Sequence, residues 1–225
     1  RRMMLPAVPA PVTLPVHGSA DRFPVRRIFC VGRNYAEHSL EMGGDPTREA
    51  PFFFTKPHDA VVESGSTIPY PPMTADLHHE AELVVAIGTR GADIPVAEAQ
   101  AHIWGFAAGN DLTRRDLQAQ AKAARRPWDM AKGFDNSAVV GLLHEGPLAD
   151  GAITCTVENR ITQSARLSDM IWSVPEIIAE LSRYVTLQPG DLIFTGTPAG
   201  VGPIGRGETC TVRIDGLSPA SVTLA

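Results

Sequence analysis

The feature that most constrains the fold is an apolar run with no polar side chain at either of its alternating positions. Residues 83–87 read LVVAI. Successive side chains of a strand point to opposite faces, so this run predicts a strand that is buried on both faces. A strand with one wet face would instead alternate between apolar and polar residues.

Short apolar runs separated by Gly, Pro and Asp continue from about Phe23 to the end of the chain, a pattern typical of β-structure. Helices are fewer: Thr113 with Asp116, and Ser173 with Glu176, predict capping boxes that open helices. There is no regular βαβ alternation, so a mixed α+β roll that is mostly β is favoured over a doubly wound sheet. The runs expected as strands are RRIFCVG, PFFFTKP, AVVESGS, AELVVAIG, HIWGFAAGND, ITCTVENR, DLIFTG and TCTVRIDG.

The 225 residues contain no linker after the first segment, so we expect one catalytic domain over residues 23–225. Residues 1–22 begin RRMMLPAVPAPVTLPVHG, where repeated prolines interrupt any signal-peptide core. We expect this segment to be an extended or mobile leader, and the sequence leaves open whether it is native.

Charge and composition exclude several classes of partner. The net charge is −5 and the pI is about 5.8, so neither nucleic acid nor an anionic membrane surface is an expected partner. No stretch approaches the roughly 18 apolar residues of a membrane span. Three widely spaced cysteines argue against a disulfide framework and a thiolate zinc site, and favour a reducing, cytoplasmic location.

Two glutamates before the apolar run are the strongest functional signal. Glu80 and Glu82 are two residues apart, so in a strand both carboxylates point to one face, about 7 Å apart. An E-x-E pair is most often the wet face of a half-exposed strand. In a strand buried on both faces, however, a cation or a proton must compensate the two charges. Asp111, after the run IWGFAAG, offers a third carboxylate, and three carboxylates without cysteines suit Mg²⁺ or Mn²⁺.

Histidines near this cluster suggest a different role from zinc binding. His78 and His79 do not form an HExxH motif, although one of them could orient a ligand. His38 and Glu41 are three residues apart, so they share a face if their segment is helical. The carboxylate could then hold the imidazole in one tautomer while its other nitrogen takes a proton from water. The same spacing is also common as ordinary decoration of a helix surface.

Several further segments appear in a fixed order: GRNYAEH, FFFTKP, DLHHEAELVVAIG, NDLTRRDLQ, RRPWDMAKGFD and GDLIFTGTPAGVGP. The set, spanning roughly residues 26–217, resembles the fumarylacetoacetate hydrolase family, and within it the acylpyruvate-cleaving hydrolases. The resemblance implies a β-sandwich roll of the C-terminal type found in that family, and usually a homodimer. It also implies metal-dependent hydrolysis of a carbon–carbon bond in a small diketo acid, as in the catabolism of aromatic compounds. Fumarylpyruvate is the preferred substrate on this basis.

The resemblance also implies roles for individual residues. The metal ligands would be Glu80, Glu82 and Asp111. His38 and Glu41 would form a water-activating dyad on a mobile lid. Lys132 would be a cation beside developing negative charge, although a solvated lysine is the alternative. The expected substrate contacts are Arg33, Lys56, Arg115, Gln118 and Thr197.

Two segments fit less simply. Related chains commonly carry an Asn-Gly hairpin followed by Arg-Gln where this chain has Glu158, Asn159 and Arg160, which puts the turn and any substrate contact from it in doubt. The segment GVGPIG, within residues 200–205, has no helix after it to receive a pyrophosphate, so it predicts a tight turn at one wall of the site rather than a dinucleotide loop.

Alternative functions remain open at this point. Oxaloacetate decarboxylation, sugar-acid dehydration, and isomerisation or decarboxylation of a hydroxymuconate-type diacid all need the same stabilised enolate, so the metal ligands do not separate them. The HxxE dyad favours hydrolysis, since a decarboxylase does not need to activate water. A non-catalytic metal-binding β module is the alternative from another class.

Overall fold

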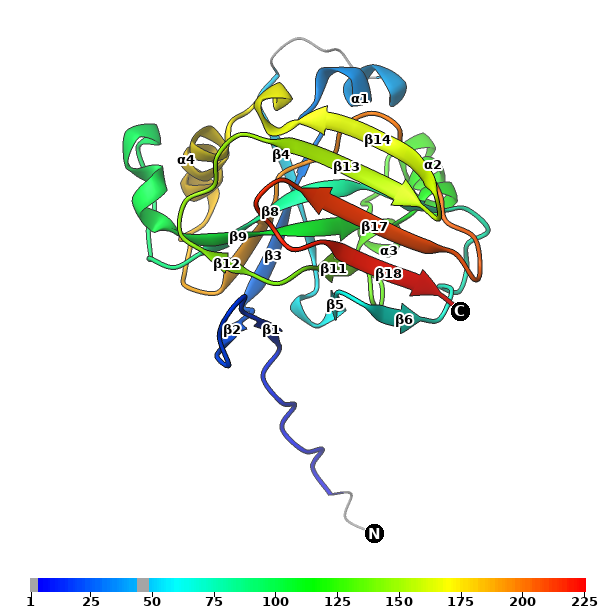
Figure 1. Ribbon diagram of the computed structural model, residues 1–225, viewed down its shortest axis with the longest axis horizontal. Helices are drawn as coiled ribbons and strands as arrows, with labels where there is room; N and C mark the ends of the chain where they lie inside the picture. Colours follow the sequence, from blue (N-terminus) through cyan, green and yellow to red (C-terminus); the bar gives the residue numbers. More distant parts are fainter. Residues whose placement is uncertain (1–3, 44–48) are drawn as a thin grey trace.

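A computed structural model describes residues 4–43 and 49–225 (Figure 1), so part of the expected leader, residues 1–3, lies outside the described residues. Strands predominate over helices, which confirms the expected fold class. The helices are α1 (Ala36–Glu41), α2 (Arg115–Ala123), α3 (Asp129–Lys132) and α4 (Val174–Tyr184), with short 3₁₀ turns at His58–Ala60, Val96–His102 and Leu167–Asp169. The strands are β1 (Thr13–Pro15), β2 (Arg22–Pro24), β3 (Arg27–Gly32), β4 (Phe52–Lys56), β5 (Val61–Glu63), β6 (Ser66–Ile68), β7 (Leu77–His79), β8 (Ala81–Ile87), β9 (Ile103–Asp111), β10 (Thr113–Arg114), β11 (Ala138–Val140), β12 (His144–Glu145), β13 (Ala152–Val157), β14 (Arg160–Arg166), β15 (Asp191–Phe194), β16 (Gly202–Pro203), β17 (Thr209–Ile214) and β18 (Ala220–Leu224).

Two sheets form the body of the protein. The larger has the order β4-β3-β15-β8-β9-β11-β5, with β12 also paired to β9. The smaller has the order β14-β13-β17-β18-β6 and lies in front of β8 and β9 in Figure 1. A three-stranded sheet, β10-β7-β16, and a hairpin of β1 and β2 complete the β-structure.

Strand β8 lies in the interior of the larger sheet, and all seven of its residues are buried. Leu83, Val85 and Ile87 belong to the core that also contains Val212 and Val222 from the smaller sheet. The intervening Val84 and Ala86 pack into a second core on the opposite face. The prediction of a strand buried on both faces is therefore confirmed.

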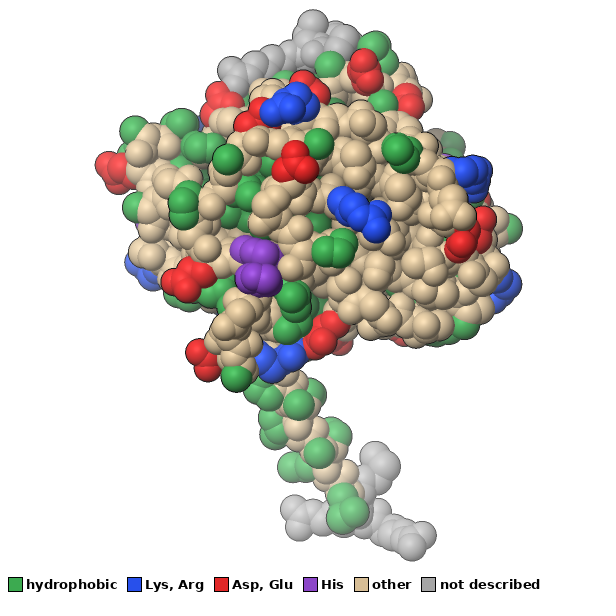
Figure 2. Space-filling model, viewed as in Figure 1, with side chains coloured by type: hydrophobic (Ala, Val, Ile, Leu, Met, Phe, Trp, Pro, Cys, Tyr) green, Lys and Arg blue, Asp and Glu red, His purple; other side chains and the backbone are tan. Residues whose placement is uncertain are grey.

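The second core is covered in part by the N-terminal hairpin. Leu14 of β1 is fully buried, and Phe23 of β2 packs in the same cluster. Residues 4–11 are exposed and carry no regular structure, and Figure 2 shows this mainly hydrophobic arm projecting from the body. The hairpin lies across the expected boundary at residue 22, and the division into leader and domain stays a prediction.

One helix start was predicted correctly and one was not. Ser173 and Glu176 form the expected capping box at the start of α4. The prediction of a capping box from Thr113 to Asp116 is wrong, because Thr113 lies in β10 and its hydroxyl donates to the Asp111 carbonyl at 3.0 Å. Helix α2 begins two residues later, at Arg115. No helix in the described part of the chain has the length and apolar character needed to cross a membrane.

Candidate active site

The three carboxylates predicted to bind a metal converge in the structure. Glu82 lies on β8 and Asp111 ends β9, and the antiparallel pairing of these strands places Glu82 opposite Gly109. The backbone N–H of Asp111 donates to the carbonyl of Glu80 at 2.9 Å, which holds the third carboxylate beside the other two. One oxygen from each of the three lies within 4.8 Å of the others, and all three side chains are buried.

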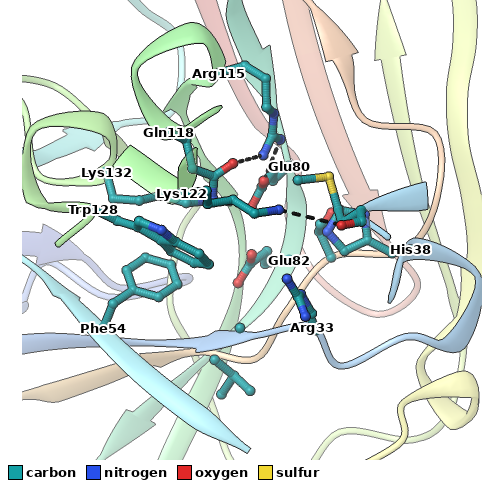
Figure 3. Close-up of a pocket in the computed structure, with 14 residues that line it drawn as sticks. Arg33, His38, Phe54, Glu80, Glu82, Arg115, Gln118, Lys122, Trp128 and Lys132 are labelled. Atoms are coloured by element: carbon teal, nitrogen blue, oxygen red, sulfur yellow. Dashed lines mark hydrogen bonds and ion pairs between the residues drawn. The ribbon is translucent and has the colours of Figure 1, made fainter. Parts of the chain in front are cut away.

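Three cations contact this cluster: Lys132, Arg115 and Lys56. Lys132 Nζ is 2.9 Å from Glu80 and 2.8 Å from Asp111, and it also donates to the Thr113 hydroxyl at 2.7 Å. Arg115 donates to Glu80 at 2.6 Å (Figure 3). Lys132 is only 2% exposed, so it is not the solvated lysine that the sequence left open.

Lys56 was expected to contact substrate, but its ammonium group contacts other residues of the protein. Its Nζ is 2.7 Å from Asp111 Oδ1 and also donates to the carbonyls of Leu112 and Lys132. Two of the three ammonium donors are thus used by backbone carbonyls, and the charge of Lys56 lies beside the Asp111 carboxylate. The geometry therefore favours a role for Lys56 in holding Asp111 in place. The predicted contact between Lys56 and substrate stays a prediction, and this arrangement does not support it.

The pKa values of the two glutamates are shifted in opposite directions. Burial alone would raise the pKa of Glu80, but Lys132 and Arg115 outweigh it and hold the pKa well below its usual range. Burial, followed by the neighbouring Asp111 and Glu80, raises the pKa of Glu82. Glu82 accepts a hydrogen bond from Gly196 N–H at 2.9 Å, but no cation contacts it within the described ranges. One buried carboxylate of the trio thus lacks compensation by the protein.

The donor set fits a divalent metal ion. Mg²⁺ binds oxygen ligands at about 2.0–2.1 Å, which separates ligands on one octahedral ion by about 3–4 Å. The observed spacing within 4.8 Å needs only a small adjustment to reach that geometry. An ion bound here would also neutralise Glu82. The residues that would hold it are Glu80, Glu82 and Asp111, as the sequence predicted.

His38 and Glu41 both lie on the short helix α1, as expected. His38 Nδ1 is 3.5 Å from the Glu41 carboxylate, which also accepts the N–H of Gly200 at 3.0 Å. The His38 side chain is buried and lines the same cavity as Glu80 and Glu82. Burial lowers its pKa below the ordinary 6.5, so the imidazole is neutral and able to accept a proton at neutral pH.

The remaining predicted substrate contacts surround one cavity. Arg33, Arg115, Gln118 and Thr197 all line it. Gln118 accepts a hydrogen bond from Arg115 at 2.6 Å, and Thr197 accepts one from Gln163 at 2.7 Å. The space open to a water-sized molecule is about 30 Å³, which is room for about one water, so a substrate must displace some of these side chains.

Several residues of this site were not predicted from the sequence. Lys122 lines the cavity one helical turn after Gln118, and this i, i+4 spacing on α2 was the available signal. Asn110 accepts the N–H of Glu80 at 2.9 Å, and Gln163 accepts that of Ala81 at 3.0 Å, so both support the carboxylate cluster from behind. No local pattern marks such supporting amides.

The segment around Glu158 still forms a hairpin without Asn-Gly. Glu158 adopts a φ of 54° between β13 and β14, and its carboxylate accepts the N–H of Thr209 at 2.6 Å. Gln163, on β14, contacts His79 and Thr197 rather than lining the cavity. Gly200, at the start of the glycine-rich segment, donates its N–H to Glu41, and Gly196, four residues before it, donates to Glu82.

Asn34 anchors the segment that leads into α1. Its buried amide donates to the carbonyls of Trp172 and Thr195, both at 2.9 Å, and accepts the N–H of Trp172 at 2.7 Å. We expect Asn34→Ala to lower the free energy of unfolding by about 2–4 kcal/mol, because buried backbone groups lose their partners. Urea denaturation tests this, with the exposed Gln120→Ala as control. A loss below about 1 kcal/mol would contradict the anchoring role.

Comparisons with known proteins agree with this architecture. The fumarylacetoacetate (FAA) hydrolase C-terminal family matches residues 27–225. A fumarylpyruvate hydrolase from Ralstonia sp. is 45% identical over 185 residues, covering 80% of this chain and 95% of the relative. A mitochondrial oxaloacetate tautomerase from Arabidopsis thaliana is 41% identical over 196 residues, covering 85% and 87%. A crystal structure of fumarylpyruvate hydrolase from Pseudomonas aeruginosa, in complex with Mn²⁺ and pyruvate, aligns with a TM-score of 0.94 at 50% identity over 99% of both chains. The chain therefore belongs to the fumarylacetoacetate hydrolase family.

Proposed function

We propose that the protein is a hydrolase that cleaves a carbon–carbon bond in an acylpyruvate, with Mg²⁺ or Mn²⁺ as cofactor. The preferred substrate is fumarylpyruvate, which would give fumarate and pyruvate. The observation that carries this proposal is a buried imidazole, 3.5 Å from the Glu41 carboxylate, in the same cavity as two of the three clustered carboxylates. The similarity to fumarylpyruvate hydrolases, one of them solved with Mn²⁺ and pyruvate, supports it.

The chain's own residues account for each proton and charge in this reaction. A divalent cation on the three carboxylates would supply Lewis-acid stabilisation of the pyruvyl oxygens. Neutral His38 removes a proton from water as the water attacks the distal carbonyl, and Glu41 stabilises the imidazolium that forms. The bond between the carbonyl carbon and the methylene carbon then breaks, leaving its electron pair on a pyruvate enolate. His38 returns the proton to that carbon, which regenerates the neutral base.

Lys132 and Arg115 hold Glu80 in its charged form throughout. Both also place positive charge near the enolate that develops at the cluster, where a dry site makes such interactions strong. Lys132 is thus a positioning residue for the carboxylates as well as a source of electrostatic stabilisation.

A second candidate activity acts on oxaloacetate. The relative from Arabidopsis thaliana is named as an oxaloacetate tautomerase, and both chemistries pass through a stabilised enolate. The dyad favours hydrolysis, because neither tautomerisation nor decarboxylation of oxaloacetate needs an activated water. Isomerisation of a hydroxymuconate-type diacid is a further alternative, and a non-catalytic metal-binding module predicts no turnover at all.

An ultraviolet assay of diketo-enol absorbance tests the proposal, with fumarylpyruvate, acetylpyruvate and oxaloacetate as substrates and with Mn²⁺, Mg²⁺ or a chelator. We expect fumarylpyruvate to have the highest kcat/KM and turnover to stop with the chelator. Faster conversion of oxaloacetate than of either acylpyruvate would favour the second candidate. We also propose a homodimer in the cytoplasm, which sedimentation and fractionation would check.

A further inference from the structure

Two cations in the active-site cavity have no negative partner among residues 4–43 and 49–225. Arg33 and Lys122 line the cavity together with Glu82 and His38. Figure 3 shows their side chains reaching into the same space, with Glu82 on one side and His38 on the other. Lys122 donates to the carbonyl of Met42 at 3.5 Å, and neither cation forms an ion pair within the part of the chain that the structure describes.

The carboxylate cluster does not need these two charges. Glu80 and Asp111 are already contacted by three cations, Lys56, Lys132 and Arg115, and a metal ion would neutralise the remaining carboxylate, Glu82. A divalent ion at the cluster would add two further positive charges. Arg33 and Lys122 therefore give the cavity an excess of positive charge that an anionic ligand must balance.

Backbone strain at Arg33 and charge repulsion at Lys122 indicate that the fold holds these two side chains in unfavourable positions. Arg33 has a φ of 59°, in the left-handed region that a side chain other than glycine seldom adopts. Such strain persists where the surrounding structure imposes it, and it clusters at binding sites. Burial, and then the nearby Arg33 and Arg115, lower the pKa of Lys122, so these cations lie close enough to repel one another.

We propose that Arg33 and Lys122 form a binding site for a second carboxylate, at the far end of the substrate's acyl arm. This inference rests on the proposed function and deepens it. The pyruvyl end would lie at the carboxylate cluster, and the carbonyl attacked by water would lie beside His38. The acyl arm beyond that carbonyl then meets Arg33 and Lys122, which select dicarboxylates such as fumarylpyruvate over acylpyruvates with a neutral acyl group.

A neighbouring groove offers a different place for the acyl arm. It has room for about 460 Å³, shares Phe54, Trp128 and Lys132 with the cavity, and includes the cation Arg126. Arg126 is exposed, so solvent and salt screen its charge far more than those of the two cavity cations. It is therefore the weaker candidate and the natural matched control.

The test compares Lys122→Met, Arg33→Gln and Arg126→Met in the full chain with saturating Mn²⁺. The measured quantity is the ratio of kcat/KM for fumarylpyruvate to that for acetylpyruvate. We expect this ratio to fall about 10–100-fold in each cavity variant, mainly through KM for fumarylpyruvate, because a charge-assisted contact to one carboxylate is lost. Arg126→Met should leave the ratio within twofold of the parent.

A binding measurement separates recognition from turnover. Calorimetry with Mn²⁺ present should show fumarate binding at least 10-fold more weakly to Lys122→Met than to the parent, with pyruvate binding unchanged. Thermal unfolding of each variant establishes that it folds, and the two cavity variants test the same site independently.

The outcomes distinguish this inference from the proposed function. If the parent protein hydrolyses neither acylpyruvate, the proposed function fails and the inference fails with it. If the parent hydrolyses fumarylpyruvate but both cavity variants keep the parent's ratio, only the inference is overturned. A selective loss in Arg126→Met instead would place the second carboxylate in the neighbouring groove.

Discussion

Replacing Glu82 with glutamine is expected to lower metal-dependent turnover by about 10³-fold or more, while the metal-free protein becomes no less stable. The carboxylate is buried beside Glu80 and Asp111, and these surroundings raise its pKa. Glutamine has nearly the same shape and removes an unfavourable buried charge. The same change removes one of three candidate metal ligands, so stability and metal binding should respond in opposite directions.

The raised pKa of Glu82 also predicts how the stability of the metal-free protein changes with pH. With its pKa raised above the ordinary 4.5, Glu82 holds a proton in the folded state at pH values where the unfolded chain has lost it. Its contribution to the stability of the metal-free parent is therefore complete below about 4.5 and is lost as pH rises above it. The advantage of Glu82→Gln over the parent should grow over that range of rising pH.

Chemical unfolding with and without Mn²⁺ measures both effects. At a Mn²⁺ concentration 100 times its dissociation constant, the parent should gain about 2.7 kcal/mol of stability, and Glu82→Gln should gain little at the same concentration. The exposed Glu98→Gln serves as control and should keep the full gain. A Glu82→Gln protein that retained turnover and the Mn²⁺-dependent gain would remove Glu82 from the metal site.

Replacing His38 with glutamine is expected to lower kcat for acylpyruvate hydrolysis about 10²–10⁴-fold, with a much smaller change in KM. The imidazole is the group placed to take a proton from water, and burial keeps it neutral by lowering its pKa from 6.5. In the parent, activity should fall only as pH drops through that lowered pKa, because protonation removes the base. The acid limb of the pH–rate profile should therefore lie below pH 6.5 and be absent in the variant.

Substrate choice makes the His38 experiment more specific. Decarboxylation of oxaloacetate needs no activated water, so any such activity should survive in His38→Gln better than hydrolysis does. The exposed His58→Gln is a matched control and should behave like the parent. Full hydrolysis by His38→Gln would assign water activation to another group.

Much of the fold could be predicted because its determinants are local. The run LVVAI required a strand buried on both faces, and the structure places Val84 and Leu83 in different cores. Ser173 and Glu176 marked a helix start, since a capping box depends on residues three apart. Thr113 and Asp116 show the same pattern without the cap, because Thr113 lies in β10 and its hydroxyl contacts the Asp111 carbonyl and Lys132. A tertiary contact outweighed the local propensity there.

The approach of Glu80 to Glu82 could be predicted from the period of a strand, and the residues themselves offered Asp111 as a third carboxylate and His38 with Glu41 as a dyad. The resemblance then assigned roles to all five. The contact between Lys56 and Asp111 could not be predicted from the sequence. The strands that carry these residues are not neighbours in the sheet, so no local spacing or strand pairing brings them together.

The sequence by itself thus determined which carboxylates and which imidazole the site has, because strand alternation, helix spacing and ordered motifs are properties of residues close along the chain. Only the tertiary structure decided how the charges are matched. It pairs Lys56, Lys132 and Arg115 with carboxylates and, as far as the described residues extend, leaves Arg33 and Lys122 without them. The physical reason is that Coulomb interactions depend on distance through space, and the folded chain sets those distances between residues far apart in sequence.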